Sequence, residues 1–367
     1  MSVVATAFEA NTNPTDWRLQ IAEPRRRIMR GWFWTIAAFT LCVLIVGGVT
    51  RLTHSGLSIV DWDPLMGVIP PLSHDEWQAA FERYQQFPQY QKVNQGMTLG
   101  EFRFIYFWEY LHRLLARTIG IVFLAPFAFF LAKRWMNRPL ALRSLALFGL
   151  GAMQGLMGWL MVASGLVDRP SVSHYRLAAH LSLAFLIFGY AVWLARDLRV
   201  TAEQPRVAAP VRARLIRALT ALGILLGAQI VWGAFVAGLK AGFFANTFPR
   251  MGGAWIPATL FDYQPALRNL VANPVTVQWL HRVLGTLLLI GVAVYVWQLA
   301  KGQVDRVSRR HGLILLVVIA IQYLLGVLTL INAVPVALGV AHQATAMMLF
   351  GVWVTALHHA RGLRMEA

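Results

Sequence analysis

Residues 32–50 read WFWTIAAFTLCVLIVGGVT and contain no charged side chain. A helix of about 20 apolar residues is long enough to cross the hydrocarbon core of a bilayer. Similar runs recur along the chain: 57% of its 367 residues are hydrophobic and only 13% are charged. Average soluble proteins carry about 25% charged residues. The composition therefore excludes a soluble globular enzyme, a disulfide scaffold and a disordered chain.

We predict eight membrane spans, and hence an all-α polytopic membrane protein. The spans lie near residues 32–50, 104–131, 140–163, 175–195, 215–237, 275–299, 312–332 and 336–358. An even number of spans places both termini on one side of the membrane. The first 31 residues lack the apolar core of a cleavable signal peptide, so we expect the first span to be retained.

The distribution of charge indicates which side holds the termini. The net charge is +17, and a basic chain often indicates nucleic-acid binding. Here, however, most Lys and Arg residues lie in short segments between apolar runs, on the side of the termini. Because Lys and Arg accumulate on the cytoplasmic side, we expect cytoplasmic termini and no nucleic-acid partner. Residues 51–103 and 238–274 would then be external, the first with short interfacial helices.

Short motifs recur between the two halves of the chain at nearly one offset. The pairs are Leu111-His112-Arg113 with Leu280-His281-Arg282, Gln154–Gly158 with Gln322–Gly326, Ala179-His180 with Ala341-His342, and Gly189 with Gly351. Pro64–Gly67 in the first outer loop also resembles Pro249–Gly252, at a larger offset. Each half has four spans, so both halves have the same orientation. The repeat predicts two four-helix bundles related by a pseudo-twofold axis along the membrane normal.

We divide the chain according to this repeat. The predicted parts are a cytoplasmic N-terminal tail (1–31), an N-terminal four-helix half (32–195) with the outer loop 51–103, a cytoplasmic linker (196–214), a C-terminal four-helix half (215–360) with the outer loop 238–274, and a C-terminal tail (361–367).

Four of the ten histidines occupy repeat-equivalent positions, roughly two turns into the even-numbered spans: His112, His180, His281 and His342. Polar residues at that depth are costly and are usually functional or paired. Two histidines on neighbouring helices can hold a heme iron from both faces. A single such histidine would more simply bond a neighbouring helix, but the fourfold recurrence favours ligation. We predict one heme-sized site per half, at His112 with His180 and at His281 with His342.

The remaining histidines lie in or beside outer loops or at the inner surface, and we expect none of them to be a ligand: His54, His74, His174, His311, His358 and His359. A zinc site is not expected either, because no third ligand stands at a usable spacing.

The two halves differ beside these histidines. Glu109 precedes His112 by three residues and shares its helix face, whereas Gln278 occupies the equivalent position before His281. A carboxylate in a membrane span is expensive, so its replacement by an amide indicates two different tasks. The Gln278 half would hold a permanent cofactor, and Glu109 would relay protons at a reactive site. The alternative is an ion pair between Glu109 and Arg113.

Arg113 and Arg282 directly follow their histidines, and an arginine at this depth needs a partner. A heme propionate would supply a bidentate one. Reaching out to the lipid headgroups would satisfy the same guanidinium, and the sequence leaves both interpretations open.

Two stretches resemble one known family. Residues 47–58, GGVTRLTHSGLS, followed by Trp62, Pro64, Gly67 and Pro70-Pro71, resemble the first outer loop of heme A synthases, and residues 106–117, YFWEYLHRLLAR, resemble their second helix. Residues 246–251 and the later histidines also fit, so that the similarity covers about residues 30–360. It points to the proteobacterial and mitochondrial branch. Some bacterial members carry a cysteine pair in an outer loop, but Cys42 is the single cysteine here, so a thiol-based redox step is not expected.

The resemblance implies an enzyme that oxidises the C8 methyl of heme O to a formyl by successive hydroxylations, giving heme A for terminal oxidases. It implies a resident heme b ligated by His281 and His342, near Gln278 and Arg282. It also implies that His112 and His180 flank the iron of the substrate heme, with Arg113 binding it and Glu109 beside it as a catalytic residue.

This family membership further implies an inner-membrane protein with its heme sites near the periplasmic side. Heme O synthase and oxidase assembly factors are the implied protein partners, and a homo-oligomer is left open. The residues alone stop at two heme-like sites, one of them with a carboxylate. A di-heme electron-transfer cytochrome b therefore remains an alternative. A heme transporter is a weaker one, because Pro126 is the one proline deep in a predicted span.

Overall fold

The computed structural model describes residues 16–60, 69–163, 171–200 and 205–365, and every predicted span is a helix there. The spanning helices are α1 (Glu23–Leu52), α4 (Leu99–Ala132), α5 (Arg138–Ala163), α6 (His174–Asp197), α7 (Ala209–Gly238), α9 (Pro274–Lys301), α10 (Arg306–Ile331) and α11 (Val336–Gly362). The prediction of an all-α chain with eight membrane-spanning helices is confirmed. The sole strands among the described residues are β1 (Arg206–Val207) and β2 (Arg364–Met365), which pair in parallel.

Several helices begin before the apolar run that predicted them. Helix α1 starts at Glu23, inside the predicted tail 1–31, and α7 starts at Ala209, inside the predicted linker 196–214. Both carry a proline in the first turn, where a missing N–H costs nothing. Helix α4 starts at Leu99 behind a capping box on Thr98, so His112 lies deeper in its helix than two turns. Apolar length marks the lipid-facing part of a helix, and these polar extensions lie outside it.

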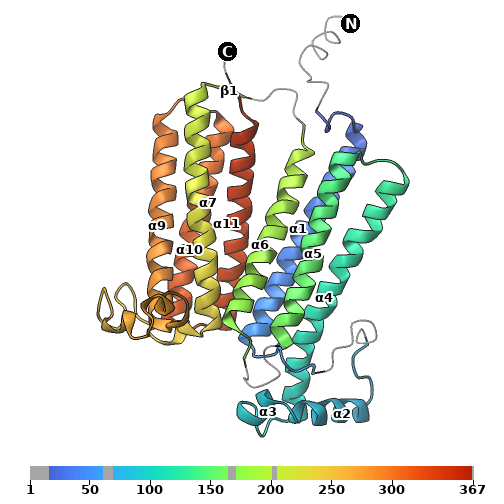
Figure 1. Ribbon diagram of the computed structural model, residues 1–367, viewed down its shortest axis with the longest axis vertical. Helices are drawn as coiled ribbons and strands as arrows, with labels where there is room; N and C mark the ends of the chain where they lie inside the picture. Colours follow the sequence, from blue (N-terminus) through green and yellow to red (C-terminus); the bar gives the residue numbers. More distant parts are fainter. Residues whose placement is uncertain (1–15, 61–68, 164–170, 201–204, 366–367) are drawn as a thin grey trace, which may run out of the picture.

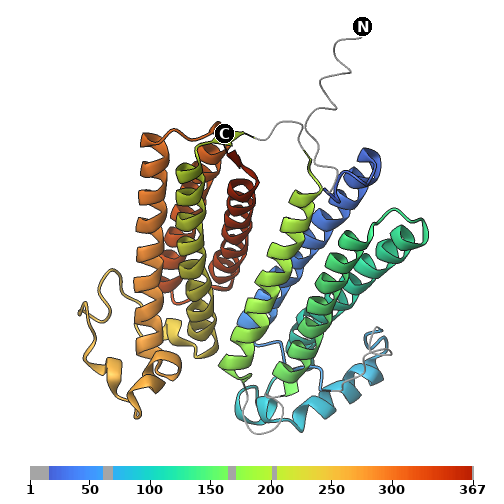
Figure 2. The same ribbon diagram turned by 45° about the horizontal axis from the view of Figure 1, so that its top comes forward.

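The helices form two groups of four (Figures 1 and 2). Helices α1, α4, α5 and α6 make the first group, and α7, α9, α10 and α11 make the second. The groups meet through α1 and α6 on one side and α7 and α11 on the other. Helix α1 begins and α11 ends at the same end of the molecule (Figure 1). This arrangement is compatible with the predicted pseudo-twofold relation between the halves.

The contact between α6 and α11 is reciprocal. A Cβ added to Gly189 would lie 2.5 Å from Cε1 of Phe350, and one added to Gly351 would lie 2.8 Å from Cε1 of Phe188. Each helix therefore inserts a phenylalanine ring against a glycine of the other. Such a self-complementary contact is the type that a twofold axis generates.

One pair of helices breaks the equivalence. Helices α9 and α10 pack along each other, whereas their counterparts α4 and α5 contact each other far less. Three glycines of α5, at 149, 151 and 155, also have no neighbouring atom within 4 Å of an added Cβ. The first half is therefore the more open of the two on its α4–α5 side.

Short helices cover the end of the molecule opposite the termini (Figure 1), as expected for residues 51–103. Helices α2 (His74–Gln85) and α3 (Pro88–Lys92) pack on the start of α4. The second outer segment contains η1 (Ala241–Phe243), η2 (Ala258–Phe261), η3 (Ala266–Arg268) and α8 (Asn269–Ala272). The motif 64–67 of the predicted repeat lies outside the described residues.

Substitution of Gly189 by alanine tests the contact between the halves. The added methyl group displaces the ring of Phe350, and overpacking of this kind costs about 1–3 kcal/mol. Gly151→Ala is the matched control, because its Cβ meets open space and alanine favours the helix. We expect a lower thermal unfolding midpoint in detergent for Gly189→Ala only. Equal midpoints for the two variants would contradict the close approach of α6 and α11.

Candidate functional site

All four repeated histidines are seated against a glycine of a neighbouring helix. A Cβ added to the glycine would lie 2.8–3.1 Å from the imidazole in every case, so that the ring would have to shift to admit a larger residue. The four contacts are Gly47 (α1) with His112 (α4), Gly158 (α5) with His180 (α6), Gly233 (α7) with His281 (α9), and Gly326 (α10) with His342 (α11). The same helix pairs make the contact in both halves.

A glutamine stands one turn before three of these glycines. The Nε2 atoms of Gln154 and Gln322 lie 3.3 Å from Nε2 of His180 and His342, and that of Gln229 lies 3.4 Å from Nε2 of His281. In α1 the equivalent position, one turn before Gly47, is occupied by Val43. His112 is therefore the one of the four without a glutamine neighbour of this kind.

The second pair of histidines has the spacing that an iron between two imidazoles requires. The ring centroids of His281 and His342 are 6.4 Å apart. A metal about 2 Å from each coordinating nitrogen, with the ring radii added, gives a separation of roughly 6–7 Å. Nδ1 of His281 and of His180, and the Oε1 atoms of the three glutamines, are buried with no hydrogen-bond partner. Buried polar atoms are rarely left unpaired, so the pockets fit a polar ligand such as a heme.

Glu109 is buried, with 2% of its surface exposed, and its carboxylate is fully engaged. Oε1 accepts a hydrogen bond from Nη2 of Arg113 at 2.7 Å. Oε2 accepts from the backbone N–H and the hydroxyl of Ser58, at 2.6 and 2.7 Å, and from the backbone N–H of Ile59 at 2.9 Å. The ion pair that the sequence left open is therefore present, and the carboxylate also fastens the chain that follows α1.

Gln278 makes the corresponding contacts with the opposite polarity. Its Nε2 donates to the carbonyl oxygen of Ala241 at 2.6 Å, and its Oε1 accepts from Nη2 of Arg282 at 2.8 Å. The loop after α1 therefore presents backbone N–H groups to Glu109, and the segment after α7 presents a backbone carbonyl to Gln278. An acceptor-only carboxylate suits the first loop, and an amide that can donate suits the second.

Arg113 and Arg282 point their guanidinium groups at these same loops. Arg113 donates to the carbonyl oxygen of Ile59 at 2.8 Å. Arg282 donates to the carbonyl oxygens of Thr247 and Ala245, both at 2.8 Å. Protein groups thus occupy much of each guanidinium. Nε of Arg282 remains buried without a hydrogen-bond partner.

A chain of hydrogen bonds joins the short helices α2 and α3 to the loop that follows α1. Asn94 donates to the hydroxyl of Tyr84 at 2.7 Å, and that hydroxyl donates to Oε1 of Gln89 at 3.0 Å. Gln89 in turn donates to the carbonyl oxygen of His54 at 2.8 Å. Burial raises the pKa of Tyr84 to about 12, so this hydroxyl stays neutral and can both donate and accept. The loop after α1 is therefore held from two sides. Helices α2 and α3 bond it at His54, and Glu109 of α4 bonds it at residues 58–59.

Arg51 is a candidate that the sequence reasoning missed. It stands one turn after Gly47, on the face of α1 that meets His112. It is half-buried, and no acceptor for its guanidinium is found among the described residues. The equivalent position in α7 is Ala237. The first half therefore has a cation beside its histidines that the second half lacks.

The glutamines and glycines were visible in the sequence as a pattern whose purpose was not recognised. Gln-x-x-x-Gly occurs at 154–158, 229–233 and 322–326, and its i, i+4 spacing puts both residues on one helix face.

Of the histidines expected not to be ligands, His358 and His359 contact carboxylates at the inner end, Asp197 and Asp305 respectively, both at 2.9 Å.

Comparison with known proteins agrees with this geometry. A family model described as "Cytochrome oxidase assembly protein" matches residues 30–354. The protein named Heme A synthase in Nitrosospira multiformis is 44% identical over 342 residues, which cover 93% of this chain and 95% of that protein. The Heme A synthase of Parvibaculum lavamentivorans is 45% identical over 327 residues, covering 89% and 92%. That of Sinorhizobium medicae is 42% identical over 341 residues, covering 93% and 91%. The chain therefore belongs to the Cytochrome oxidase assembly protein family, as a relative of bacterial heme A synthases.

Proposed function

We propose that the chain is a heme A synthase, a membrane oxidoreductase that converts heme O to heme A for terminal oxidases. The observation that carries the proposal is the pair of matched histidine sites with unequal surroundings, in a chain of this family. Two identical sites would serve electron transfer equally well. One site with an ion-paired carboxylate and an extra arginine, and one with neutral amides, favours a reacting site beside a resident one.

The resident site is assigned to heme b, held by His281 and His342. Gly233 and Gly326 leave the space that the imidazoles occupy, and Gln229 and Gln322 lie against the rings. When bound, heme b supplies one-electron chemistry. Gln278 and Arg282 fasten the outer segment 241–247 across the end of this bundle.

The substrate site is assigned to His112 and His180, which would hold the iron of heme O from its two faces. Arg51 is positioned to bind a propionate of the substrate, and the hydrogen bonds already made by Arg113 make it a weaker candidate. The sparse contact between α4 and α5 supports lateral access from the bilayer, which suits an apolar, planar substrate. The C8 methyl would be the oxidised group, by successive hydroxylations.

Glu109 is assigned the role of holding and polarising this site. Its carboxylate fixes Arg113 and residues 58–59 in one arrangement. It is also the one acidic group beside the substrate histidines in the part of the chain that the structure describes, and therefore the acidic side chain there that could accept a proton. Both effects depend on the negative charge.

The multi-pass chain is proposed to lie in the inner membrane with both termini in the cytoplasm. Arginines cluster in the first turns of α1 and at the end of α6, and Lys and Arg accumulate on the cytoplasmic side. The histidine sites would then lie toward the periplasm. Heme O synthase is the partner expected on chemical grounds, since it would supply the substrate.

Identification of the bound pigments tests the function directly. The protein is purified from membranes that make heme O, and its hemes are identified by chromatography and mass. We expect heme b together with heme O, a hydroxylated intermediate or heme A. Two equivalents of heme b per chain and no other heme would instead support a di-heme electron-transfer cytochrome.

Replacement of His281 or His342 by alanine tests the resident site. Removal of one axial ligand should abolish tight retention of heme b, because the iron loses half of its protein attachment. His358→Ala is the control, since this histidine lies at the opposite end and contacts Asp197. Absorption spectra of the purified variants provide the measurement. Unchanged heme spectra in both ligand variants would overturn the assignment.

The variant Glu109→Gln tests the reacting site. An amide has one oxygen, so glutamine can accept hydrogen bonds either from Ser58 and Ile59 or from Arg113, and its NH₂ group would face the other donors. It also cannot accept a proton. We expect heme b to remain while formyl production falls by about 10²-fold or more. Gln278→Glu, which sets a carboxylate against the carbonyl of Ala241, is the matched change in the other half. Product analysis showing wild-type turnover in Glu109→Gln would remove this residue from the mechanism.

A further inference from the structure

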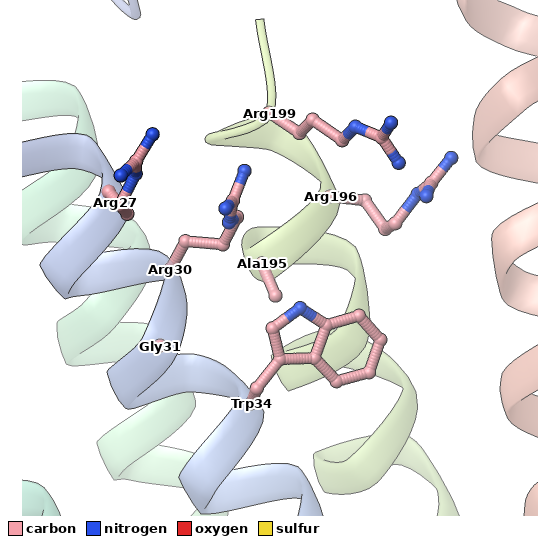
Figure 3. Close-up of a pocket in the computed structure, with 7 residues that line it drawn as sticks. All are labelled: Arg27, Arg30, Gly31, Trp34, Ala195, Arg196 and Arg199. Carbon is pink, nitrogen blue, oxygen red and sulfur yellow. The ribbon is translucent and has the colours of Figure 1, made fainter. Parts of the chain in front are cut away.

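A basic cavity lies at the end of the first bundle opposite the histidines. It has a volume of about 650 Å³ and lies between α1 and α6. Its lining consists of Arg27, Arg30, Gly31 and Trp34 from α1, with Ala195, Arg196 and Arg199 at the end of α6. Figure 3 shows the indole of Trp34 deeper in the bundle than the four arginines, with Arg196 and Arg199 extending from the end of α6 away from α1. We name these seven residues the arginine pocket.

The positive charge of the arginine pocket is poorly compensated by the protein. Arg27 makes one loose ion pair with Glu23, at 3.4 Å, and both side chains are largely exposed. Arg30, Arg196 and Arg199 have no acidic partner among the described residues. The acidic residue next to Arg196 in the chain, Asp197, is engaged elsewhere, by Arg143 at 2.8 Å and His358 at 2.9 Å.

Arg196 provides an independent sign of a missing ligand. Its Nε atom is buried and has no hydrogen-bond partner. Leaving a buried charged donor unpaired costs more than leaving a neutral one unpaired, and such atoms are uncommon in native structures. An anion bound by this guanidinium would offset a charge for which the described residues supply no acidic partner.

We propose that the arginine pocket binds the phosphate group of an anionic phospholipid. Basic pockets between membrane helices on the cytoplasmic side bind such headgroups, and guanidinium groups bind phosphate oxygens in a bidentate manner. The indole of Trp34 lies one turn deeper than Arg30, at the level where tryptophan lines the headgroup region. Gly31 leaves the wall of the cavity free of a side chain between them. Orientation of the chain by positive charge does not require four arginines to line one cavity.

The choice of a lipid over a free phosphate follows from the surroundings of the pocket. Its residues belong to membrane-spanning helices, and its floor is apolar, formed by Trp34 and Ala195. A phospholipid places its acyl chains along such a surface while its phosphate meets the arginines. Inorganic phosphate would leave this apolar surface uncovered.

Lipid retention measured by native mass spectrometry tests the proposal. Full-length protein in detergent is mixed with equal amounts of phosphatidylglycerol and phosphatidylcholine, and the bound lipid is identified. We expect the wild type to retain phosphatidylglycerol selectively. Each basic residue near a membrane surface contributes about fivefold in affinity (about 1 kcal/mol). The double variant Arg30→Gln/Arg196→Gln should therefore lose about 20-fold or more in affinity for phosphatidylglycerol.

The matched control is Arg217→Gln/Arg306→Gln. It removes the same charge from the same end of the molecule, at two exposed arginines outside the pocket, and should change the affinity by about twofold at most. A C-terminal reporter verifies that both double variants keep the wild-type orientation. If the pocket double variant does not accumulate, Arg196→Gln alone is measured, with an expected loss of about fivefold.

Three results would overturn the proposal. The first is equal retention of the two lipids by the wild type. The second is an equal loss in pocket and control variants, which would assign the effect to general surface charge. The third is full displacement of phosphatidylglycerol by an excess of inorganic phosphate, which would assign the cavity to the free anion.

Discussion

The close contact between an imidazole and a glycine backbone is the constraint on which each bundle depends. At all four positions a side chain as small as alanine would collide with the ring. The contact therefore fixes how near the two helices lie and at which height they pair. It also leaves little room for the ring to turn, because at three of the sites the glutamine one turn away lies against the neighbouring Nε2 atom of the ring. Because helix packing fixes the rings, it also fixes the position of any ligand that they bind.

The difference between the halves originates in the loops as much as in the sites. The loop after α1 offers N–H groups to Glu109, and the segment after α7 offers a carbonyl to Gln278. A carboxylate and an amide are thus each matched to a backbone of opposite polarity. The negative charge in the first half is stabilised by Arg113 and three donors, so it persists at a depth where an isolated charge would be costly. The same exchange places a carboxylate beside one histidine pair and a neutral amide beside the other.

The sequence predicted the parts of this structure that depend on local periodicity and on the repeat. Apolar runs located all eight helices, and the recurrence of His-Arg and of Ala-His singled out the four histidines. The starts of α1 and α7 were missed because polar turns outside the membrane have no hydropathy signal. Glu109 was singled out from the sequence, but its partners Ser58 and Ile59 could not be foreseen, since they approach from a loop about 50 positions away in the chain. The arginine pocket depends on the rotation of α1 against α6, which no sequence pattern reports.

Both histidine pairs join an inner helix to a peripheral one. Helices α6 and α11 lie at the contact between the halves, and they contribute His180 and His342. Helices α4 and α9 lie farther out and contribute His112 and His281. Each site is consequently closed on the side of the other half, and its exposure to lipid depends on the peripheral helices alone. Where α9 packs along α10 the site is enclosed, which suits a resident group. The sparse contact between α4 and α5 is consistent with the proposed exchange of a ligand with the bilayer. Duplication of one bundle, followed by loosening of one pair of helices, would produce the permanent and exchangeable sites that we propose.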